Sequence, residues 1–129
     1  MLYVQTVVNI VDNSGGLLGL CVRILGARKK RASAGDAIVI SVKAIILNRK
    51  LVIKRKRKVL KGTVRRVIVL RVSYRRRRSN NFFFKSSSNG VAVLGNWGLP
   101  LATRASGPAN FELKLSKYPK FANICEGVI

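Results

Sequence analysis

Hydrophobic and polar residues alternate along much of this chain with the period of two that is typical of β-strands. The segment 37–47 shows the pattern most clearly, because Ile38, Ile40 and Val42 fall on one face of a strand whereas Ser41 and Lys43 fall on the other. Similar runs rich in β-branched residues occupy residues 7–11, 17–25, 59–72 and 91–94. The pattern therefore predicts a chain built mostly from strands.

Turn-forming residues separate these runs at short intervals. The residues after the first run, 12–16, read Asp-Asn-Ser-Gly-Gly, and Gly35-Asp36 precedes the run of residues 37–47. Asn80-Asn81 is expected at the tip of a β-hairpin, because asparagine tolerates a left-handed backbone. This hairpin would form a ribbon over about residues 71–86. Many short strands without alternating helices favour a small antiparallel β-barrel.

The C-terminal segment has a different pattern. Gly107-Pro108 indicates a break, Asn110 can cap a helix, and Glu112 near its start suits the helix dipole. Pro119 ends or interrupts such a helix. We therefore expect short helical turns over about residues 109–121. No linker or internal repeat is visible, and a length of 129 residues suits one domain spanning residues 1–129.

The charge of the chain narrows its class of partner. Lys and Arg number 26, Asp and Glu only 4, and His is absent, which gives a net charge of +22. A folded domain with this imbalance repels itself unless a polyanion neutralises it. The two candidate polyanions are nucleic acid and an anionic membrane surface. The apolar runs are far shorter than the roughly 20 residues that cross a bilayer, so we favour nucleic acid and expect no membrane partner.

The acidic residues do not suit catalysis. A general acid or base normally requires a histidine or a well-placed carboxylate, and the only carboxylates are Asp12, Asp36, Glu112 and Glu126. Asp12 and Asp36 adjoin Asn or Gly in turn motifs, where a carboxylate typically accepts hydrogen bonds from backbone N–H groups. No phosphate-binding glycine motif is present. We therefore predict that the chain is not an enzyme.

The two cysteines, Cys21 and Cys125, are far apart in the sequence and belong to no CxxC pair. Without histidine they cannot complete a zinc site. We expect two free thiols in a reducing compartment, although the sequence alone leaves a disulfide open. No metal and no cofactor are expected.

Basic residues occur in clusters that mostly fall in predicted loops or on the hairpin, where long side chains can follow the uneven phosphates of folded RNA. Arginine adds a planar fork that engages phosphate oxygens two at a time. The candidate RNA-binding residues are Arg28, Lys29, Lys30, Arg31, Arg49, Lys50, Lys54, Arg55, Lys56, Arg57, Lys58, Arg65, Arg66, Arg75, Arg76, Arg77, Arg78 and Lys85.

Two aromatic features have alternative interpretations. The three residues Phe82–Phe84 follow the predicted hairpin tip, where rings alternate between faces. They could stack on RNA bases, but packing against the barrel or a neighbouring protein is favoured. Trp97 is expected to cover one end of the barrel.

Several motifs extend beyond composition, and they occur in order along the chain. Together they resemble bacterial-type large-subunit ribosomal protein fourteen. They are Gln5-Thr6-x-Val8-x-Ile10-Val11-Asp12-Asn13-Ser14-Gly15, then Gly35-Asp36 before a β-branched strand, then Asn89-x-x-x-Val93-Leu94, and finally Ala102-Thr103-Arg104-x-x-Gly107-Pro108 with Glu112-Leu113.

The resemblance implies a five-stranded β-barrel with a projecting ribbon and short C-terminal helices. It also implies a structural constituent of the large ribosomal subunit that supports translation at the face meeting the small subunit. The expected partners are large-subunit rRNA, small-subunit rRNA in an intersubunit bridge, and ribosomal protein nineteen. A ribosome-silencing factor docks on this family near positions that correspond to Thr103, Arg104 and Lys120.

The chain departs from the family pattern in a few places. The hairpin tip often reads Asp-Gly in the family, and Ser86 stands where the family has an aromatic residue. Acidic residues are scarcer than in bacterial members. This bias, with no apparent presequence, favours a copy encoded in an organelle, in the mitochondrial matrix rather than in a plastid or the bacterial cytoplasm.

Two functions of other classes remain as alternatives at this point. One is a free RNA chaperone with an oligonucleotide-binding barrel, which would need exposed aromatic residues on the barrel face. The other is a basic peripheral membrane protein.

Overall fold

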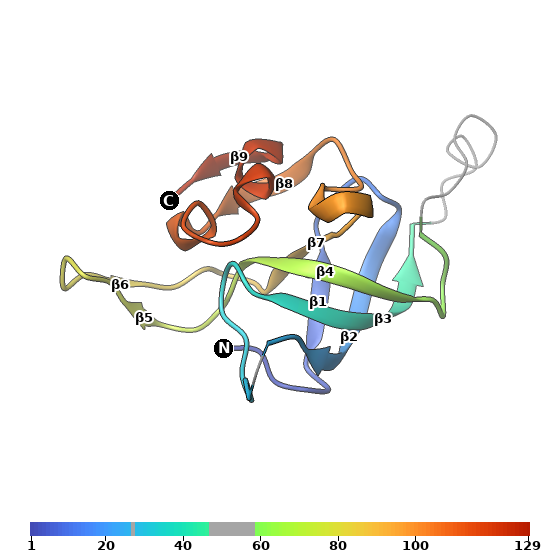
Figure 1. Ribbon diagram of the computed structural model, residues 1–129, viewed down its shortest axis with the longest axis horizontal. Helices are drawn as coiled ribbons and strands as arrows, with labels where there is room; N and C mark the ends of the chain where they lie inside the picture. Colours follow the sequence, from blue (N-terminus) through green and yellow to red (C-terminus); the bar gives the residue numbers. More distant parts are fainter. Residues whose placement is uncertain (27, 47–58) are drawn as a thin grey trace.

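A five-stranded closed β-barrel forms the body of the protein (Figure 1). The computed structural model describes residues 1–26, 28–46 and 59–129. The alternating runs of the sequence form the barrel strands, which confirms the predicted mostly-β class. These strands are β1 (Val7–Ile10), β2 (Gly16–Ile24), β3 (Ala37–Ile45), β4 (Val64–Arg71) and β7 (Gly90–Val93).

The prediction of a wholly antiparallel barrel is wrong at one pair of strands. β1 pairs with β2, β2 with β3, β3 with β4 and β4 with β7, all antiparallel, but β1 and β7 pair in parallel. The reason is the odd number of strands. When direction reverses at each of four successive pairings, the fifth strand points the same way as the first, so closure requires a parallel pair.

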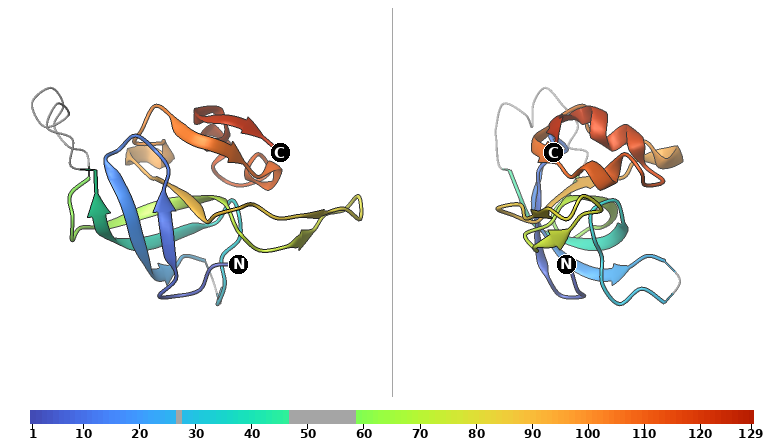
Figure 2. Two further views of the ribbon diagram at one scale, coloured as in Figure 1. Left: turned by 180° about the vertical axis from the view of Figure 1, so that it is seen from behind. Right: turned by 90° about the vertical axis from the view of Figure 1, so that its left-hand side faces the viewer.

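β4 contributes to two hydrophobic cores. Val67 and Val69 are buried inside the barrel, whereas Ile68 and Leu70 are buried in a second core outside it. Successive side chains of a strand point to opposite faces, so four consecutive buried residues require cover on both sides. The cover on the outer side is the C-terminal region (Figure 2).

The C-terminal region is less helical than predicted. Its helical turns are short 3₁₀ helices, η2 (Phe111–Leu113) and η3 (Pro119–Ile124), and the second runs beyond the predicted limit of residue 121. β8 (Ala105–Ala109) and β9 (Cys125–Val128) form a parallel two-stranded sheet that the sequence did not predict. The predicted break at Gly107-Pro108 lies inside β8, as part of this small sheet.

The two remaining strands, β5 (Arg76–Arg77) and β6 (Phe83–Phe84), pair in antiparallel fashion. They form a ribbon that extends away from the barrel (Figures 1 and 2). Asn81 at its tip has φ 63°, as expected for an asparagine in a left-handed turn. We use the name ribbon for residues 72–86, because the backbone N–H of Ser86 donates to the carbonyl of Val72 at the base.

Cys21 lies in the barrel core and Cys125 is half-buried on β9, and both are free thiols. Burial raises the pKa of both thiols. The structure therefore agrees with the expectation of two free thiols.

The buried carboxylate of Asp12 joins the end of β1 to β7. Its Oδ1 accepts hydrogen bonds from the backbone N–H and the hydroxyl of Ser14, and its Oδ2 accepts a 2.6 Å hydrogen bond from the N–H of Val93. Because Asp12 is 6% exposed, these donors stand in for water. The predicted role of Asp12 as a turn cap is confirmed, and the same side chain also fastens the parallel pair of strands.

Replacing Asp12 with alanine should lower the free energy of unfolding by about 3 kcal/mol, because two buried backbone donors lose a charged acceptor. Urea unfolding measures this change. Glu126→Ala is the matched control, since it removes the same charge from an exposed position and should change stability by less than about 0.5 kcal/mol. If both variants unfold at the same urea concentration, the Asp12 hydrogen bonds do not stabilise the barrel.

Candidate RNA-binding surface

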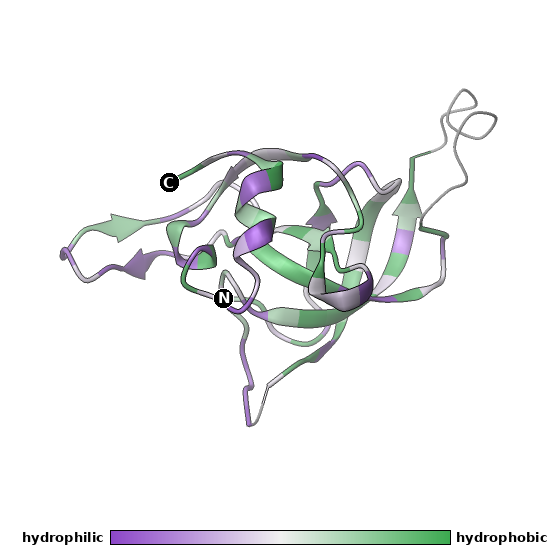
Figure 3. Ribbon diagram, turned by 45° about the horizontal axis from the view of Figure 1, so that its top comes forward, coloured by the Kyte–Doolittle hydropathy of each residue, from purple (hydrophilic) through white to green (hydrophobic). Residues whose placement is uncertain are grey.

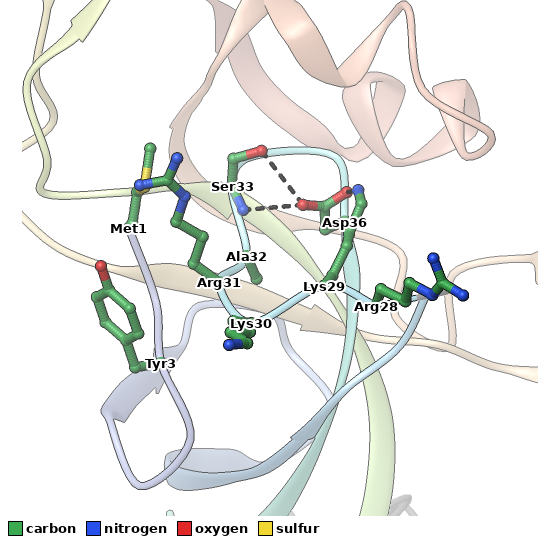
Figure 4. A pocket seen from close by; sticks show the side chains of 9 residues that line it. All are labelled: Met1, Tyr3, Arg28, Lys29, Lys30, Arg31, Ala32, Ser33 and Asp36. Atoms are coloured by element: carbon green, nitrogen blue, oxygen red, sulfur yellow. Dashed lines mark hydrogen bonds and ion pairs between the residues drawn. The ribbon is translucent and has the colours of Figure 1, made fainter.

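The loop between β2 and β3 carries the first basic cluster, Arg28–Arg31 (Figure 4). Lys29 Nζ lies 2.6 Å from Asp36 Oδ1, and the other oxygen of that carboxylate accepts a 2.9 Å hydrogen bond from the N–H of Ser33. Asp36 therefore caps its turn as predicted, and it also holds one of the four basic side chains. Lys29 is for this reason a structural residue as well as a surface charge.

The N-terminus lies against the same loop. Leu2 and Ala32 exchange backbone hydrogen bonds of 2.9 and 2.8 Å, and Met1, Tyr3 and Arg31 line one open pocket with the rest of the cluster (Figure 4). Partial burial and the positive charge of Arg31 lower the pKa of the Met1 ammonium group. The pocket thus brings the N-terminal residues beside the basic side chains of the loop.

The two faces of the ribbon carry similar side chains. Side chains that lie directly opposite on paired strands share a face, and the register places Arg76 opposite Phe84 and Arg77 opposite Phe83. Because successive residues alternate, Arg76, Arg78 and Phe84 share the inner face, and Arg75, Arg77 and Phe83 share the outer face. Figure 3 shows the hydrophilic β5 beside the hydrophobic β6.

The inner face is anchored to the C-terminal region. The guanidinium of Arg78 donates hydrogen bonds to both oxygens of Glu112, at 3.1 and 3.3 Å, and a third, of 2.7 Å, to the carbonyl of Ile129. It also lies 4.5 Å from the ring centroid of Phe84, and Arg76 approaches Glu112 at 4.0 Å. Arg78 therefore holds the ribbon in place, and its donors are engaged within the protein.

The outer face is open. Arg75 and Arg77 are exposed, and the guanidinium of Arg75 lies 4.2 Å from the ring centroid of Phe83. Arg77 donates a 2.8 Å hydrogen bond to the side chain of Asn81 at the tip. These contacts order both arginines without neutralising them. In the sequence, residues 75–78 form one uniform basic cluster. In the structure, Arg76 and Arg78 contact Glu112, whereas Arg75 and Arg77 are exposed to solvent.

The contact between Arg78 and Glu112 lowers the pKa of the glutamate. Burial on its own would raise the pKa of the carboxyl group, but the hydrogen bonds from Arg78 and the Glu112 backbone, with the charges of Arg78 and Arg76, outweigh burial and lower the pKa. The sequence predicted that Glu112 interacts favourably with the dipole of a short helix. Its actual partner lies 34 residues away in the sequence.

The other basic candidates are dispersed. Arg65 and Arg66 lie on β4, and Lys85 is exposed near the base of the ribbon. Arg49, Lys50 and Lys54–Lys58 lie outside the described residues. The sequence reasoning missed Arg71, whose Nη1 donates hydrogen bonds of 2.8 and 3.3 Å to the carbonyls of Ser106 and Pro108 and so fastens β8 to the end of β4.

The predicted protein-partner residues lie in two segments, with Thr103 and Arg104 directly before β8 and Lys120 in η3. The side chain of Asn13 donates a 3.0 Å hydrogen bond to Thr103 Oγ1 and accepts a 3.1 Å one from the N–H of Thr103. Arg104 is exposed and lines an open pocket with the end of η3. Lys120 is exposed near the start of η3, and the lining of that pocket does not include it.

The structure contradicts the expectation for Trp97, and for Phe82 and Phe83 it excludes packing on the barrel but does not test contact with a neighbouring protein. Trp97 does not cover a barrel end, because its side chain in η1 (Asn96–Gly98) is 96% exposed on a backbone with φ 60°. Phe82 and Phe83 do not pack on the barrel, since they are 73% and 55% exposed. Only Phe84 is half-buried. The outward direction of the ribbon, which depends on the Glu112 anchor, explains this exposure.

Most of the described cations have no carboxylate partner. The salt bridges within the described ranges involve Lys29, Arg76 and Arg78 alone. The same residues contain no group of three or more potential metal ligands, and no helix among them has the length and apolar character needed to span a bilayer. The fold and its surface thus define a small basic β-barrel protein whose charge suits a polyanionic partner.

Comparison with protein families identifies the chain. The model of the family described as ribosomal protein L14p/L23e matches residues 1–129, so the chain belongs to that family. Membership makes it a structural constituent of the large ribosomal subunit rather than an enzyme. The family resemblance drawn from the sequence motifs is confirmed.

The pH dependence of stability should reveal the Glu112 anchor. The pKa of Glu112 is lower in the folded protein than in the unfolded chain, so its ionised form stabilises the fold above its ordinary value of 4.5. That contribution is lost as the pH falls through the lower, folded-state pKa. At pH 7, Glu112→Gln should therefore reduce the free energy of unfolding by about 1–2 kcal/mol.

Urea unfolding of the wild type and the Glu112→Gln variant between pH 7 and pH 3 measures this effect. The difference between the two proteins should shrink as the pH drops below about 4.5, because protonation removes the same charge that the substitution removes. A difference that stays constant over this range would contradict the assigned role of the carboxylate.

Proposed function

We propose that the chain is held in the large ribosomal subunit by contacts between its basic surface and rRNA phosphates. The main support is the shortage of internal partners. Asp12, Asp36 and Glu112 bind groups of the protein itself, so they cannot screen most of the cations. Phosphates of rRNA would supply the missing negative charge and release bound counterions.

The residues with the strongest structural support lie in two places. The loop cations Arg28, Lys30 and Arg31 are exposed and line one pocket. Arg75 and Arg77 are exposed on the outer face of the ribbon. Arg66 and Lys85 can add contacts, and the basic residues within 49–58 remain part of the proposal on sequence grounds.

The more detailed partners rest on the family likeness. We propose contacts with small-subunit rRNA in an intersubunit bridge and with ribosomal protein nineteen. Thr103, Arg104 and Lys120 form the candidate surface for a ribosome-silencing factor. Only the first two lie close together, and Asn13 engages the hydroxyl of Thr103, which makes Arg104 the principal candidate.

We also propose that residues 1–129 act as one domain and that the protein belongs to a mitochondrial ribosome. The shared strand β4, which packs into both hydrophobic cores, supports a single folding unit. The scarcity of acidic residues and the bias toward Ile, Val, Leu, Phe and Ser support an organelle-encoded member. Family membership argues against the alternatives of a free RNA chaperone and a peripheral membrane protein.

Sedimentation tests the proposed location directly. In a lysate prepared at low salt, the tagged full-length chain should travel with large subunits through a sucrose gradient, and high salt should release it to the top. If intact large subunits sediment without the chain at low salt, the proposed function is wrong.

A pair of neighbouring arginines separates RNA contact from anchoring. Arg77→Ala should lower the slope of log affinity against log salt by about one unit for a large-subunit rRNA fragment, because it removes one phosphate contact. Its stability should change little. Arg78→Ala should mainly reduce the free energy of unfolding, because it leaves Glu112 without its hydrogen bonds.

Filter binding over a range of KCl concentrations and urea unfolding provide the two measurements. The proposal requires Arg77→Ala to change mainly the salt slope of binding and Arg78→Ala to change mainly the free energy of unfolding. An unchanged salt slope for Arg77→Ala would place the outer face of the ribbon away from RNA phosphates.

A further inference from the structure

The ring of Phe83, on the outer face of the ribbon, has no role in anchoring the ribbon or in the phosphate binding proposed for Arg75 and Arg77. Phe83 is 55% exposed although the rest of the ribbon is ordered by hydrogen bonds at both its tip and its base. An exposed aromatic ring costs free energy in water, and a rigid ring held away from the protein body is suited to contact a partner.

The surroundings of Phe83 indicate the chemistry of that partner. The guanidinium of Arg75 lies 4.2 Å from the ring centroid, and Arg77 lies directly opposite Phe83 in the strand register. A negatively charged partner is therefore favoured beside the ring. An acidic peptide offers charge but no flat surface, whereas a nucleotide offers a phosphate and a planar base together.

We propose that Phe83 stacks on an unpaired base of RNA while Arg75 and Arg77 bind the adjacent phosphates. This inference rests on the proposed rRNA-binding function and specifies the form of RNA that one part of the surface recognises. Arg75 packs against the ring and helps to orient it. A base outside a helix presents its face to such a ring, whereas a base inside a duplex is already stacked on its neighbours.

The opposite face of the ribbon provides a matched control. Phe82 is more exposed than Phe83, at 73%, but it follows the alternation of the inner face and has no described arginine over its ring. Phe82→Leu and Phe83→Leu remove the same aromatic group from adjacent positions. Both variants keep an apolar side chain and all of the positive charge.

The experiment compares two RNA probes with the full-length chain in the same buffer. One probe is an unstructured 12-nucleotide oligouridine, and the other is a 12-base-pair RNA duplex. Phe83→Leu should weaken binding of the single strand about tenfold and leave binding of the duplex unchanged. Phe82→Leu should change neither by more than about twofold.

A 2-aminopurine placed within the oligouridine adds a direct readout of stacking. Its fluorescence should fall on binding to the wild type and to Phe82→Leu, and should fall less on binding to Phe83→Leu. If Phe83→Leu loses affinity equally for the single strand and the duplex, the stacking assignment is wrong. It is also wrong if Phe82→Leu and Phe83→Leu weaken binding of the single strand equally. Failure of the wild type to bind the oligouridine at all would also overturn it.

Binding of the wild type to rRNA distinguishes a failure of the stacking proposal from a failure of the proposed function. If the wild type still binds a large-subunit rRNA fragment with a steep salt dependence while Phe83→Leu behaves like the wild type on every probe, only the stacking proposal is wrong. If the wild type binds no rRNA, the proposed function itself is wrong.

Discussion

Repulsion among the positive charges is the constraint on which the rest of this structure depends. The chain has a net charge of +22 and only four carboxylates, so each carboxylate that the fold uses has a large effect. Asp12 fastens the closing pair of barrel strands, Asp36 orders a basic loop, and Glu112 holds the ribbon. None of the three is available to screen the outer surface. The cohesive force must therefore come from the apolar cores, while the repulsion is relieved from outside by a polyanion.

The double use of β4 connects the core to the candidate RNA-binding surface. One face of this strand fills the barrel, and the other packs on Leu113 and Phe121 of the C-terminal region. That packing places Glu112, the neighbour of Leu113, where it can bind Arg78 of the ribbon. The hydrophobic core outside the barrel thereby determines the direction of the basic ribbon. Because the inner face of the ribbon is bound to the C-terminal region, the outer face points to solvent.

The sequence predicted the parts of this structure that depend on local patterns. Alternation located the five barrel strands, and Asn80-Asn81 located the tip of the ribbon, because strand periodicity and left-handed turns are properties of short segments. The parallel pairing of β1 with β7 was missed because it follows from closure of the whole barrel. The small sheet of β8 and β9 was missed for a similar reason, since its strands are joined by a connection that contains two 3₁₀ helices.

The candidate site shows the same division between local and distant information. Clusters such as Arg28–Arg31 and Arg75–Arg78 could be found from composition alone. Their division into anchors and free cations could not, because Arg78 meets Glu112 across 34 residues and Lys29 meets Asp36 only through the fold of the loop. The exposure of Phe83 likewise depends on the outward direction of the ribbon, which the contact between Arg78 and Glu112 holds.

A density map of the assembled large subunit containing this chain tests the central claim most directly. We expect the outer face of the ribbon and the Arg28–Arg31 loop to lie against rRNA phosphates, with Arg78 still bound to Glu112 inside the protein. A map in which both basic surfaces face solvent, with the chain held by protein contacts alone, would contradict the account.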